Sequence, residues 1–565
     1  MSYDIKIVGG TIVDGTGSPG YQGDVGIKNG QVVALGDAPE AADKTIDASG
    51  RVVCPGFVDI HTHYDAQIMW DRMMTISPWH GVTTTVIGNC GFGVAPTRPE
   101  HRRLILRTLE NVEGMSLDAL EAGLGSDWPF ETFPEYLDAI EERGSAINLG
   151  VLIGHTPLRM YVMGEESVER SATDDEVAQM RAIVHDALEA GAVGFATSKA
   201  LTHLGYDGKP VPSRLADIEE IYELAAPLGE VGGMMQANIG PEFYLKELGK
   251  IAKDNNTTVS WTALLAGLFG PGGHRKQLDR TAEMVENGVN VIPQVACRPL
   301  NFEFQWETPF PFEPMPLVGD LGGVSREERL AAYADPEWRQ QFTESLLPVF
   351  QGWWDRTVIA DYEPDRSLEE RKLADIAAER GVDPVDLALD MAVETDMKAR
   401  FRLSVLNIDE DEISDLLNDP NTVLGLSDAG AHASQLCDAC FSTHLLGHWS
   451  REKGVLSLEQ AVRTLTSRPA EVFGIKDRGR LAVGMPADVV VFDPETVGAG
   501  PLQRVYDLPG DADRLKSEAT GIEAVIVNGT LLREGGVDQV DPEGDLPGRL
   551  LRHGAAAPIE QLAAE

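Results

Sequence analysis

Short apolar runs alternate with helical periodicity through the middle of the chain. Runs of this kind are typical of strands buried on both faces of a parallel sheet. Eight of them are present, at Phe57–His61, Thr83–Ile87, Ile147–Ile153, Ala192–Ala196, Gly233–Ala237, Thr258–Thr262, Asn290–Ala296 and Thr422–Leu426. Eight strand–helix units predict an α/β fold, a (β/α)8 TIM-like barrel, with its chemistry at the carboxyl ends of the strands. A doubly wound open sheet is the alternative, and no Gly-rich dinucleotide fingerprint supports it.

Between these runs, one helix signal is clearer than the others. It covers Thr173–Ala190, where Thr173 and Glu176 have the spacing of a capping box and Gly191 provides the stop. This segment predicts a helix that connects two strands of the barrel.

The two ends of the chain have a different pattern. Short β-branched runs separated by glycines fill residues 1–55, and similar runs such as Ala487–Phe492 return in residues 479–545. Neither piece is large enough to stand alone. We therefore predict one small β-sandwich formed from both termini, with the barrel in residues 56–478 and a C-terminal tail in residues 546–565.

Residues 297–364 interrupt the alternation. This stretch is rich in Pro, Phe and Trp, and it is too long for a simple barrel connection. One interpretation is a lid or an apolar wall of the substrate pocket at the catalytic face. The alternative is a packed excursion that only covers the barrel.

Two histidines end the first strand. Because side chains alternate along a strand, His61 and His63 point the same way and form half of a transition-metal site. Asp428 follows the eighth strand, which lies beside the first in a closed barrel. It can coordinate the metal and act as the general base, or it can merely cap the following helix.

Further candidates follow other strands. Cys90 lies between glycines after the second strand, where it predicts a thiolate ligand, with simple packing as the alternative. His155 and Arg159 follow the third strand and Lys199 the fourth. Each can contact substrate or serve the structure, and Lys199 can alternatively form a carboxylated bridge.

Cys437 and Cys440 have the spacing of a redox or zinc pair. No second pair completes it, so we expect two core cysteines on a helix.

The composition limits the classes of molecule that the chain is expected to bind. The chain has 47 basic and 90 acidic residues, a net charge of −43 at pH 7, which argues against binding nucleic acid or an anionic membrane. The start MSYDIKIVGG lacks a secretory pattern, no apolar run could cross a bilayer, and five scattered cysteines do not form a disulfide framework. We predict a cytoplasmic protein that acts on a small molecule; assembly into a homo-oligomer is left open.

Several motifs together resemble one protein family. CPGFVDIHTHYDAQ, HGVTTTVIGNCGFGVAP, GLSDAGAH and AVRTLTSRPAEVFGIKDRGRLAVGMPADVVVFDP are similar to the amidohydrolase superfamily, and more closely to its D-aminoacylase branch, the N-acyl-D-amino-acid deacylases. The resemblance covers nearly the whole chain and implies a metal-bearing barrel with a flanking β-sandwich. It also implies that His61, His63 and Cys90 are metal ligands and that Asp428 is the catalytic aspartate.

The chain departs from that branch at two strands. The branch has histidine ligands at the ends of the fifth and sixth strands, whereas here Gly233–Asn238 and Val259–Ala263 contain none. Gln236 stands about where the fifth-strand ligand belongs, and an amide oxygen is a poor zinc ligand. His203 and His274 are candidates to reach the site from loops.

The resulting prediction is a metal-dependent amidohydrolase, a hydrolase that cleaves the C–N bond of an N-acyl amino acid with Asp428 as general base. Zn²⁺ suits the ligands best, as one ion or two. Candidates for substrate binding are His155, Arg159, Lys199, Gln236 and Arg298. The alternatives are another C–N, C–C or ester cleavage in the same barrel, or a non-catalytic binding protein.

Overall fold

The chain forms two compact units. A computed structural model describes residues 2–309, 311–313, 315–346 and 352–553. The first unit comprises Met1–Arg298, Asp411–Ala433 and Cys437–Glu565, and the second comprises Pro299–Glu410 with Ser434–Leu436.

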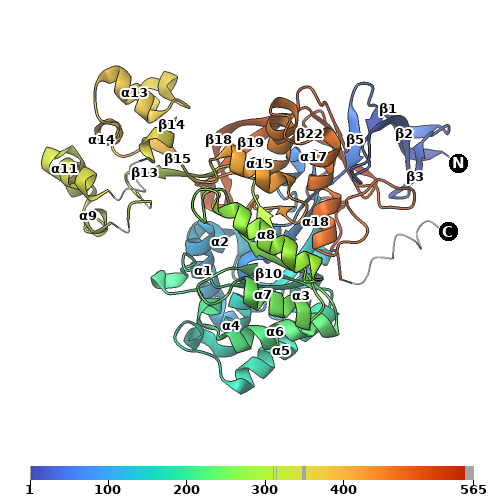
Figure 1. The fold of residues 1–565 in the computed structure, drawn as a ribbon, viewed down its shortest axis with the longest axis horizontal. Coiled ribbons are helices and arrows are strands. Elements are labelled where there is room, and N and C mark those ends of the chain that lie inside the picture. Colours follow the sequence, from blue (N-terminus) through green and yellow to red (C-terminus); the bar gives the residue numbers. More distant parts are fainter. Residues whose placement is uncertain (1, 310, 314, 347–351, 554–565) are drawn as a thin grey trace. The chain divides into compact units, whose positions relative to one another are not determined.

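A parallel sheet of eight strands forms the centre of the first unit (Figure 1). Its strands are β6 (Phe57–Asp59), β7 (Val82–Ile87), β8 (Asn148–Gly154), β9 (Gly194–Ser198), β10 (Met234–Asn238), β11 (Val259–Thr262), β12 (Val291–Val295) and β16 (Val423–Leu424). They pair in sequence order, and each overlaps one of the eight predicted runs. Apolar side chains such as Val58, Val86 and Leu152 form one buried cluster.

The first and last strands approach each other beyond their carboxyl ends. A parallel bridge joins Thr62 to Ala429, and the His63 amide donates a hydrogen bond of 2.7 Å to the Ala429 carbonyl. The sheet is therefore curled, and the arrangement fits a TIM-like barrel. This confirms the predicted α/β class.

Helices occupy the connections between the strands (Figure 1). Those of the first unit are α1 (Arg102–Glu113), α2 (Leu117–Leu124), α3 (Phe133–Arg143), α4 (His155–Met163), α5 (Asp174–Glu189), α6 (Ile218–Glu230), α7 (Leu245–Asp254), α8 (Gly273–Glu286), α15 (Glu410–Asn418), α16 (Phe441–His444), α17 (Leu458–Leu465) and α18 (Ser467–Val472). Helix α5 confirms the predicted capping box: Thr173 accepts a hydrogen bond from the Glu176 amide, and Glu176 accepts one from the Thr173 amide.

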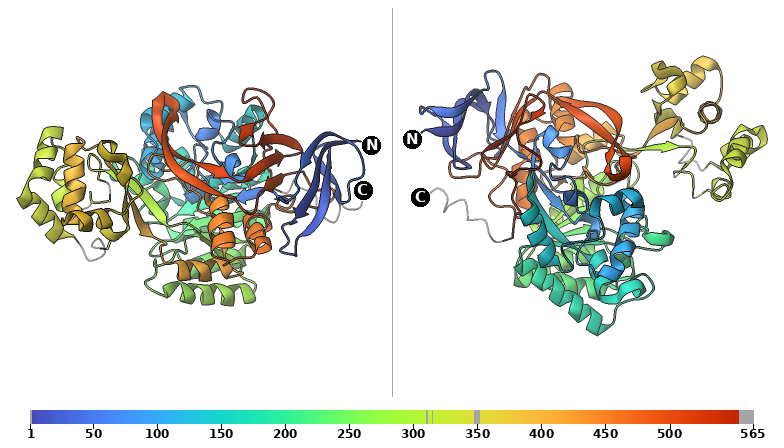
Figure 2. Two further views of the ribbon diagram at one scale, coloured as in Figure 1. Left: turned by 90° about the horizontal axis from the view of Figure 1, so that it is seen from above. Right: turned by 180° about the vertical axis from the view of Figure 1, so that it is seen from behind.

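Both ends of the chain build a second sheet, of nine strands (Figure 2). Its strands are β1 (Tyr3–Ile12), β2 (Tyr21–Lys28), β3 (Gln31–Gly36), β4 (Ala42–Asp47), β5 (Val52–Pro55), β17 (Val489–Phe492), β20 (Ile522–Val527), β21 (Thr530–Glu534) and β22 (Val537–Asp538). The antiparallel pairing of Val490 with Cys54 joins the two ends, and a ribbon of β18 (Gly498–Leu508) and β19 (Ala512–Thr520) lies outside this sheet. The termini thus combine as predicted, while their arrangement as a sandwich stays a prediction.

The second unit has a core of its own. Among the described residues of this unit, helices accompany a sheet in the order β13-β15-β14. The elements are β13 (Leu300–Gln305), α9 (Pro316–Gly319), α10 (Arg326–Ala334), α11 (Pro336–Ser345), β14 (Thr357–Asp361), α13 (Leu373–Arg380), α14 (Pro384–Glu394) and β15 (Arg400–Leu406). Aromatic residues of the predicted insertion pack on one another here, for example Trp306 against Phe312 with ring centroids 5.7 Å apart. Residues 310, 314 and 347–351 of the insertion, like residues 554–565 of the predicted tail, lie outside the described residues.

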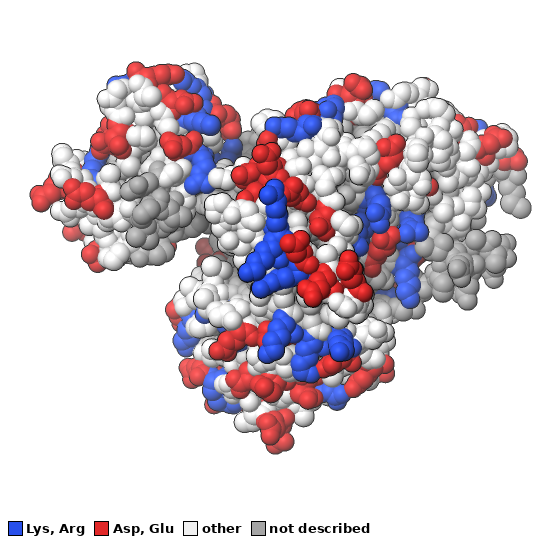
Figure 3. Space-filling model, in the orientation of Figure 1, with Lys and Arg blue, Asp and Glu red and all other residues white. Residues whose placement is uncertain are grey.

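Charged side chains are interleaved over the surface. Figure 3 shows acidic and basic groups side by side on the face in view, and many of the basic groups have acidic partners. Arg170, for instance, contacts Glu166 at 2.6 Å and Glu176 at 2.8 Å. Within the described part of the chain, no helix is both long enough and apolar enough to span a membrane.

Candidate metal centre and active site

Four predicted residues meet at the carboxyl ends of β6, β7 and β16. The Nε2 atom of His61 lies 3.3 Å from the Cys90 Sγ atom and 3.4 Å from Asp428 Oδ1. The Nε2 atom of His63 lies 3.7 Å from the same carboxylate oxygen. One ligand atom each of His61, His63 and Cys90 lies within 4.8 Å of the others, so the three side chains could hold a metal ion.

Two further side chains lie against the other ring nitrogens of the two imidazoles. His61 Nδ1 lies 2.7 Å from Gln294 Oε1, on β12, and His63 Nδ1 lies 3.0 Å from Glu113 Oε1, at the end of α1. Each contact leaves the Nε2 atom facing the cluster, which is how histidine ligands are commonly held in metal sites. Sequence reasoning missed both partners. Gln294 gave one signal, as a polar residue inside an apolar run; Glu113 gave none.

A tight turn after β7 presents Cys90. Cys90 itself has a left-handed backbone, with φ 58°, and its amide donates a hydrogen bond of 2.7 Å to Gln236 Oε1. The flanking glycines leave room for the neighbouring strands. A Cβ on Gly88 would lie 2.1 Å from the Leu152 carbonyl oxygen, and one on Gly91 would lie 2.8 Å from the Thr197 Cα. Only glycine therefore fits at positions 88 and 91.

Opposite charges favour ionised ligands in this buried cluster. Burial raises the pKa of the Asp428 carboxyl, but a hydrogen bond with His63 and the charges of His61, His63 and His432 together hold that pKa well below its usual range. Burial likewise opposes ionisation of the Cys90 thiol, whereas His61 and His63 hold its pKa below the ordinary value. A thiolate and a carboxylate beside two imidazoles form a suitable donor set for a divalent cation.

The fifth and sixth strands contribute amide and hydroxyl groups. Gln236 does lie beside the cluster, but its Oε1 accepts from the Cys90 amide. Its Nε2 donates to Asn238 Oδ1 at 3.1 Å and to Thr262 Oγ1 at 3.3 Å. The described residues of β10 and β11 thus offer no imidazole to a second ion.

The two histidines expected to reach the site from loops differ in position, and His274 does not lie in a loop. His203 borders the cluster: its ring centroid lies 5.0 Å from that of Phe92, which lies 6.5 Å from that of His63. Its Nδ1 lies 2.7 Å from Ser198 Oγ. His274, on α8, instead contacts Asp415 at 3.0 Å and Glu412 at 3.3 Å. Only His203 has a neighbour in common with the predicted ligands.

His155 and Arg159 form a buried polar network. His155 contacts Glu220 at 2.8 Å and Thr197 at 2.7 Å, and Arg159 donates to Glu220 at 2.6 Å. Both side chains are fully buried. This network links α4 to α6 and fits the structural alternative; a contact of either residue with substrate stays a prediction.

The other predicted cations also have protein partners. Lys199 Nζ donates to the Arg214 and Ala216 carbonyls at 2.7 Å each, and Arg298 Nε contacts Asp438 at 2.6 Å. Whether Lys199 and Arg298 contact substrate also stays a prediction.

The two spaced cysteines are buried, as predicted, but not on a helix. Cys437 lies in irregular backbone, and Cys440 lies in the turn just before α16. The Cys440 thiol donates to the Cys437 carbonyl at 3.4 Å. The expected helix is wrong because the chain stays irregular from Asp428 until it reaches α16.

Comparison with known proteins identifies the family. The amidohydrolase family model matches residues 44–233 and 332–533, so the chain belongs to the amidohydrolase family. It is 30% identical to the D-aminoacylase of Alcaligenes xylosoxydans xylosoxydans, over 93% of this chain and 94% of that protein. It is also 30% identical to the N-acyl-D-glutamate deacylase of the same organism, over 98% and 97% of the two chains. The resemblance to the D-aminoacylase branch is confirmed.

Solved structures of D-aminoacylases and of a related deacylase are similar to this chain. A D-aminoacylase crystal structure is 28% identical and has a TM-score of 0.66, covering 98% of this chain and all of that one. Another D-aminoacylase structure, described as having a binuclear metal centre with one-metal activation, has a TM-score of 0.67 at the same identity and coverage. The N-acyl-D-glutamate deacylase of Bordetella bronchiseptica, complexed with zinc and a phosphonate inhibitor, has a TM-score of 0.64 at 28% identity over 98% of this chain and all of that one.

The family match has a gap that falls on the altered strands. Residues 234–331 lie outside the matched ranges, and they include β10, β11 and β12. The strands that end in Asn238 and Thr262, where no histidine is present, lie within this gap.

Proposed function

We propose that the chain is a metal-dependent amidohydrolase that cleaves the amide bond of an N-acyl amino acid, as D-aminoacylases do, with Asp428 as general base. One observation carries the proposal: Asp428 Oδ1 lies within 3.4 Å and 3.7 Å of two imidazole nitrogens, in His61 and His63, whose other ring nitrogens contact Gln294 and Glu113. The D-aminoacylase and deacylase relatives support the substrate class.

The donor set fits one divalent metal, most simply Zn²⁺. Two imidazoles, a thiolate and a carboxylate are ligands that zinc accepts. We assign the ion to His61, His63, Cys90 and Asp428. When bound, it would lower the pKa of a water molecule and polarise the substrate carbonyl. A second ion has no imidazole at the ends of β10 and β11, which favours a one-metal site.

The chain's own residues perform the proton transfer. Asp428 is held as a carboxylate by its imidazole neighbours, so it can accept a proton from the attacking water and deliver it to the leaving nitrogen. Such general acid–base catalysis contributes about 10²–10⁴-fold to a rate. Glu113 and Gln294 keep the two imidazoles in orientation, so they act as positioning residues.

The proposed domain organisation assigns this chemistry to residues 56–478, with the insertion at about 297–364, and the flanking sandwich to residues 1–55 and 479–545. The pairing of β17 with β5 supports a joint origin of the flanking part from both ends of the chain. Residues 546–565 are the tail.

A panel of N-acetyl amino acids in D and L forms tests the proposal. The zinc-loaded protein is expected to release free amino acid from at least one D compound, and Asp428→Asn to lose about 10²–10⁴-fold of that rate. Absence of turnover on every amide, with turnover of an ester or another C–N bond, would favour a second candidate function, cleavage of a different bond in the same barrel. The altered ends of β10 and β11 support that candidate. An undiminished rate in Asp428→Asn would refute the base assignment.

A further inference from the structure

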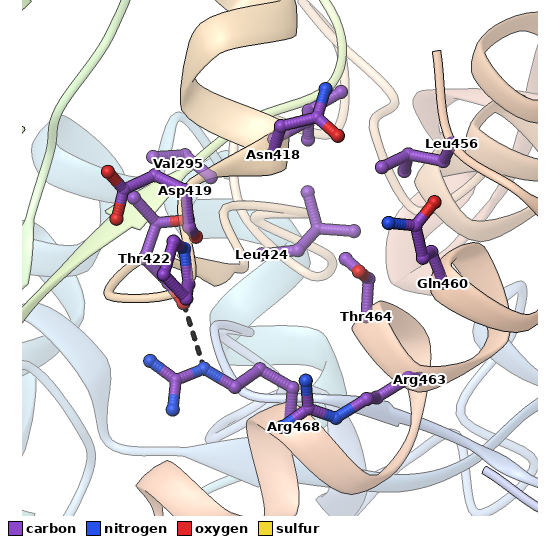
Figure 4. Close-up of a pocket in the computed structure, with 12 residues that line it drawn as sticks. Val295, Asn418, Asp419, Thr422, Leu424, Leu456, Gln460, Arg463, Thr464 and Arg468 are labelled. Atoms are coloured by element: carbon purple, nitrogen blue, oxygen red, sulfur yellow. Dashed lines mark hydrogen bonds between the residues drawn. The ribbon is translucent and has the colours of Figure 1, made fainter. Parts of the chain in front are cut away.

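A cavity lies in the first unit (Figure 4), and none of the four proposed metal ligands lines it. Its volume is about 220 Å³, and its walls come from the end of α15, the start of β16 and the helices α17 and α18. Arg463, Gln460 and Thr464 contribute from α17, and Arg468 from α18. The cavity is smaller than the roughly 300–1,000 Å³ of drug-sized ligand sites, so it suits a small ligand.

Two guanidinium groups face this cavity. Arg468 Nε donates a hydrogen bond of 2.9 Å to the Thr422 carbonyl. This bond fixes the side chain, and it does not involve the two terminal guanidinium nitrogens. Figure 4 shows Arg463 extending along the same edge of the cavity. Burial lowers the pKa of Arg468 and the charge of Arg463 lowers it further, while Glu471 and Asp419 act in the opposite direction.

The nearby carboxylates are engaged with other groups. Glu471 lies 3.7 Å from Arg463 but 2.6 Å from Arg480, which does not line the cavity. Asp419 Oδ1 accepts a hydrogen bond of 2.8 Å from the Asn421 amide. Within the described residues, no ion pair joins Arg468 to a carboxylate. Asp419, which also lines the cavity, and Glu471 match the two arginines in number, but neither forms an ion pair with Arg468.

Neutral groups add hydrogen-bonding capacity. Gln460 Oε1 accepts from the Ser457 amide at 2.8 Å, so its Nε2 is the end that remains for the cavity. Figure 4 shows Gln460 and Thr464 turned toward the interior. Together with the arginines they offer hydrogen-bond donors to the cavity, whose lining also includes the Asp419 carboxylate.

We propose that this cavity is a binding site for a small oxyanion of the phosphate type, held by Arg463 and Arg468. The planar guanidinium fork matches the oxygens of phosphate, and charge-assisted pairs of this kind are stronger than neutral hydrogen bonds. Bound anion would link Thr422, at the start of β16, to α17 and α18. The site is independent of the proposed amide hydrolysis.

Calorimetric titration with inorganic phosphate, at constant ionic strength set with chloride, tests this site. Wild-type protein is expected to bind about one phosphate per chain, and Arg463→Gln and Arg468→Gln each to weaken binding at least tenfold. Arg480→Gln is the matched control, because it removes the same charge beside Glu471 without altering the cavity lining, and it should bind as wild type does. The exposed position of Arg463 makes its variant the safer one to fold.

Phosphate can also bind a catalytic metal, so the titration is repeated on His61→Ala/His63→Ala. If the His61→Ala/His63→Ala variant still binds phosphate, the cavity site is supported. If that variant loses phosphate binding while Arg463→Gln keeps it, the cavity site is contradicted. Equal binding by wild type, Arg463→Gln and Arg468→Gln, or none by wild type, would also overturn the proposal. A parallel titration with glycerol 3-phosphate distinguishes the source: tighter binding than that of free phosphate identifies a phosphomonoester as the ligand.

Discussion

At the scale of single residues, the candidate site depends on left-handed backbone as well as on side chains. Cys90, Leu426, Asp428 and His432 have φ angles of 58°, 63°, 46° and 47°. Non-glycine residues adopt this conformation at a cost of about 1–3 kcal/mol each, and such residues cluster at functional sites. Here they direct Cys90 and Asp428 toward the two histidines.

Glu113 gives the first prediction at this scale. Its carboxylate lies 3.0 Å from His63 Nδ1, and removing a partner of this kind from a metal-bound histidine typically weakens metal affinity about 10–100-fold. Glu113→Ala should therefore lose zinc affinity by that factor, measured by competition with a chelating indicator. Glu121→Ala, which removes an exposed glutamate on α2 that is paired with Arg103, is the control. Equal affinity in both variants would show that Glu113 does not position His63.

At the scale of elements, Gln236 ties β10 to the turn that carries Cys90. If this amide is a tether and not a ligand, Gln236→Ala should leave the visible absorption spectrum of the Co²⁺-loaded protein unchanged. Loss of the buried hydrogen bond should lower the free energy of unfolding by about 1–3 kcal/mol. Gln277→Ala, which removes the acceptor of a 2.7 Å hydrogen bond from Tyr244 on another element, is a matched control for the loss of a buried amide. A changed cobalt spectrum in Gln236→Ala alone would make Gln236 a ligand.

The elements also show which features a sequence reveals. All eight barrel strands could be predicted, because a strand buried on both faces is a continuous apolar run. His61 and His63 could be placed together because strand side chains alternate. Glu113 could not be found, because it reaches His63 only through the packing of α1, and no local pattern encodes that contact. The backbone around Cys437 and Cys440 could not be predicted either, because the spacing of these cysteines fits a helix that the chain does not form.

At the scale of the whole molecule, two units with separate cores divide the chain. Of the aromatic residues that suggested a lid, four are buried in the second unit's own core: Phe304, Trp306, Phe312 and Trp354. The metal ligands and the arginine-lined cavity both belong to the first unit. Its barrel therefore provides the scaffold for the proposed catalysis and for the proposed anion site.

The central claim is a single metal held by side chains from β6, β7 and β16. Elemental analysis by plasma mass spectrometry, on zinc-loaded wild type and on His61→Ala/His63→Ala after identical dialysis, tests it most directly. We predict about one metal ion per wild-type chain and almost none in the variant. Two ions per wild-type chain would contradict the one-metal site, and undiminished metal in the variant would contradict the ligand assignment.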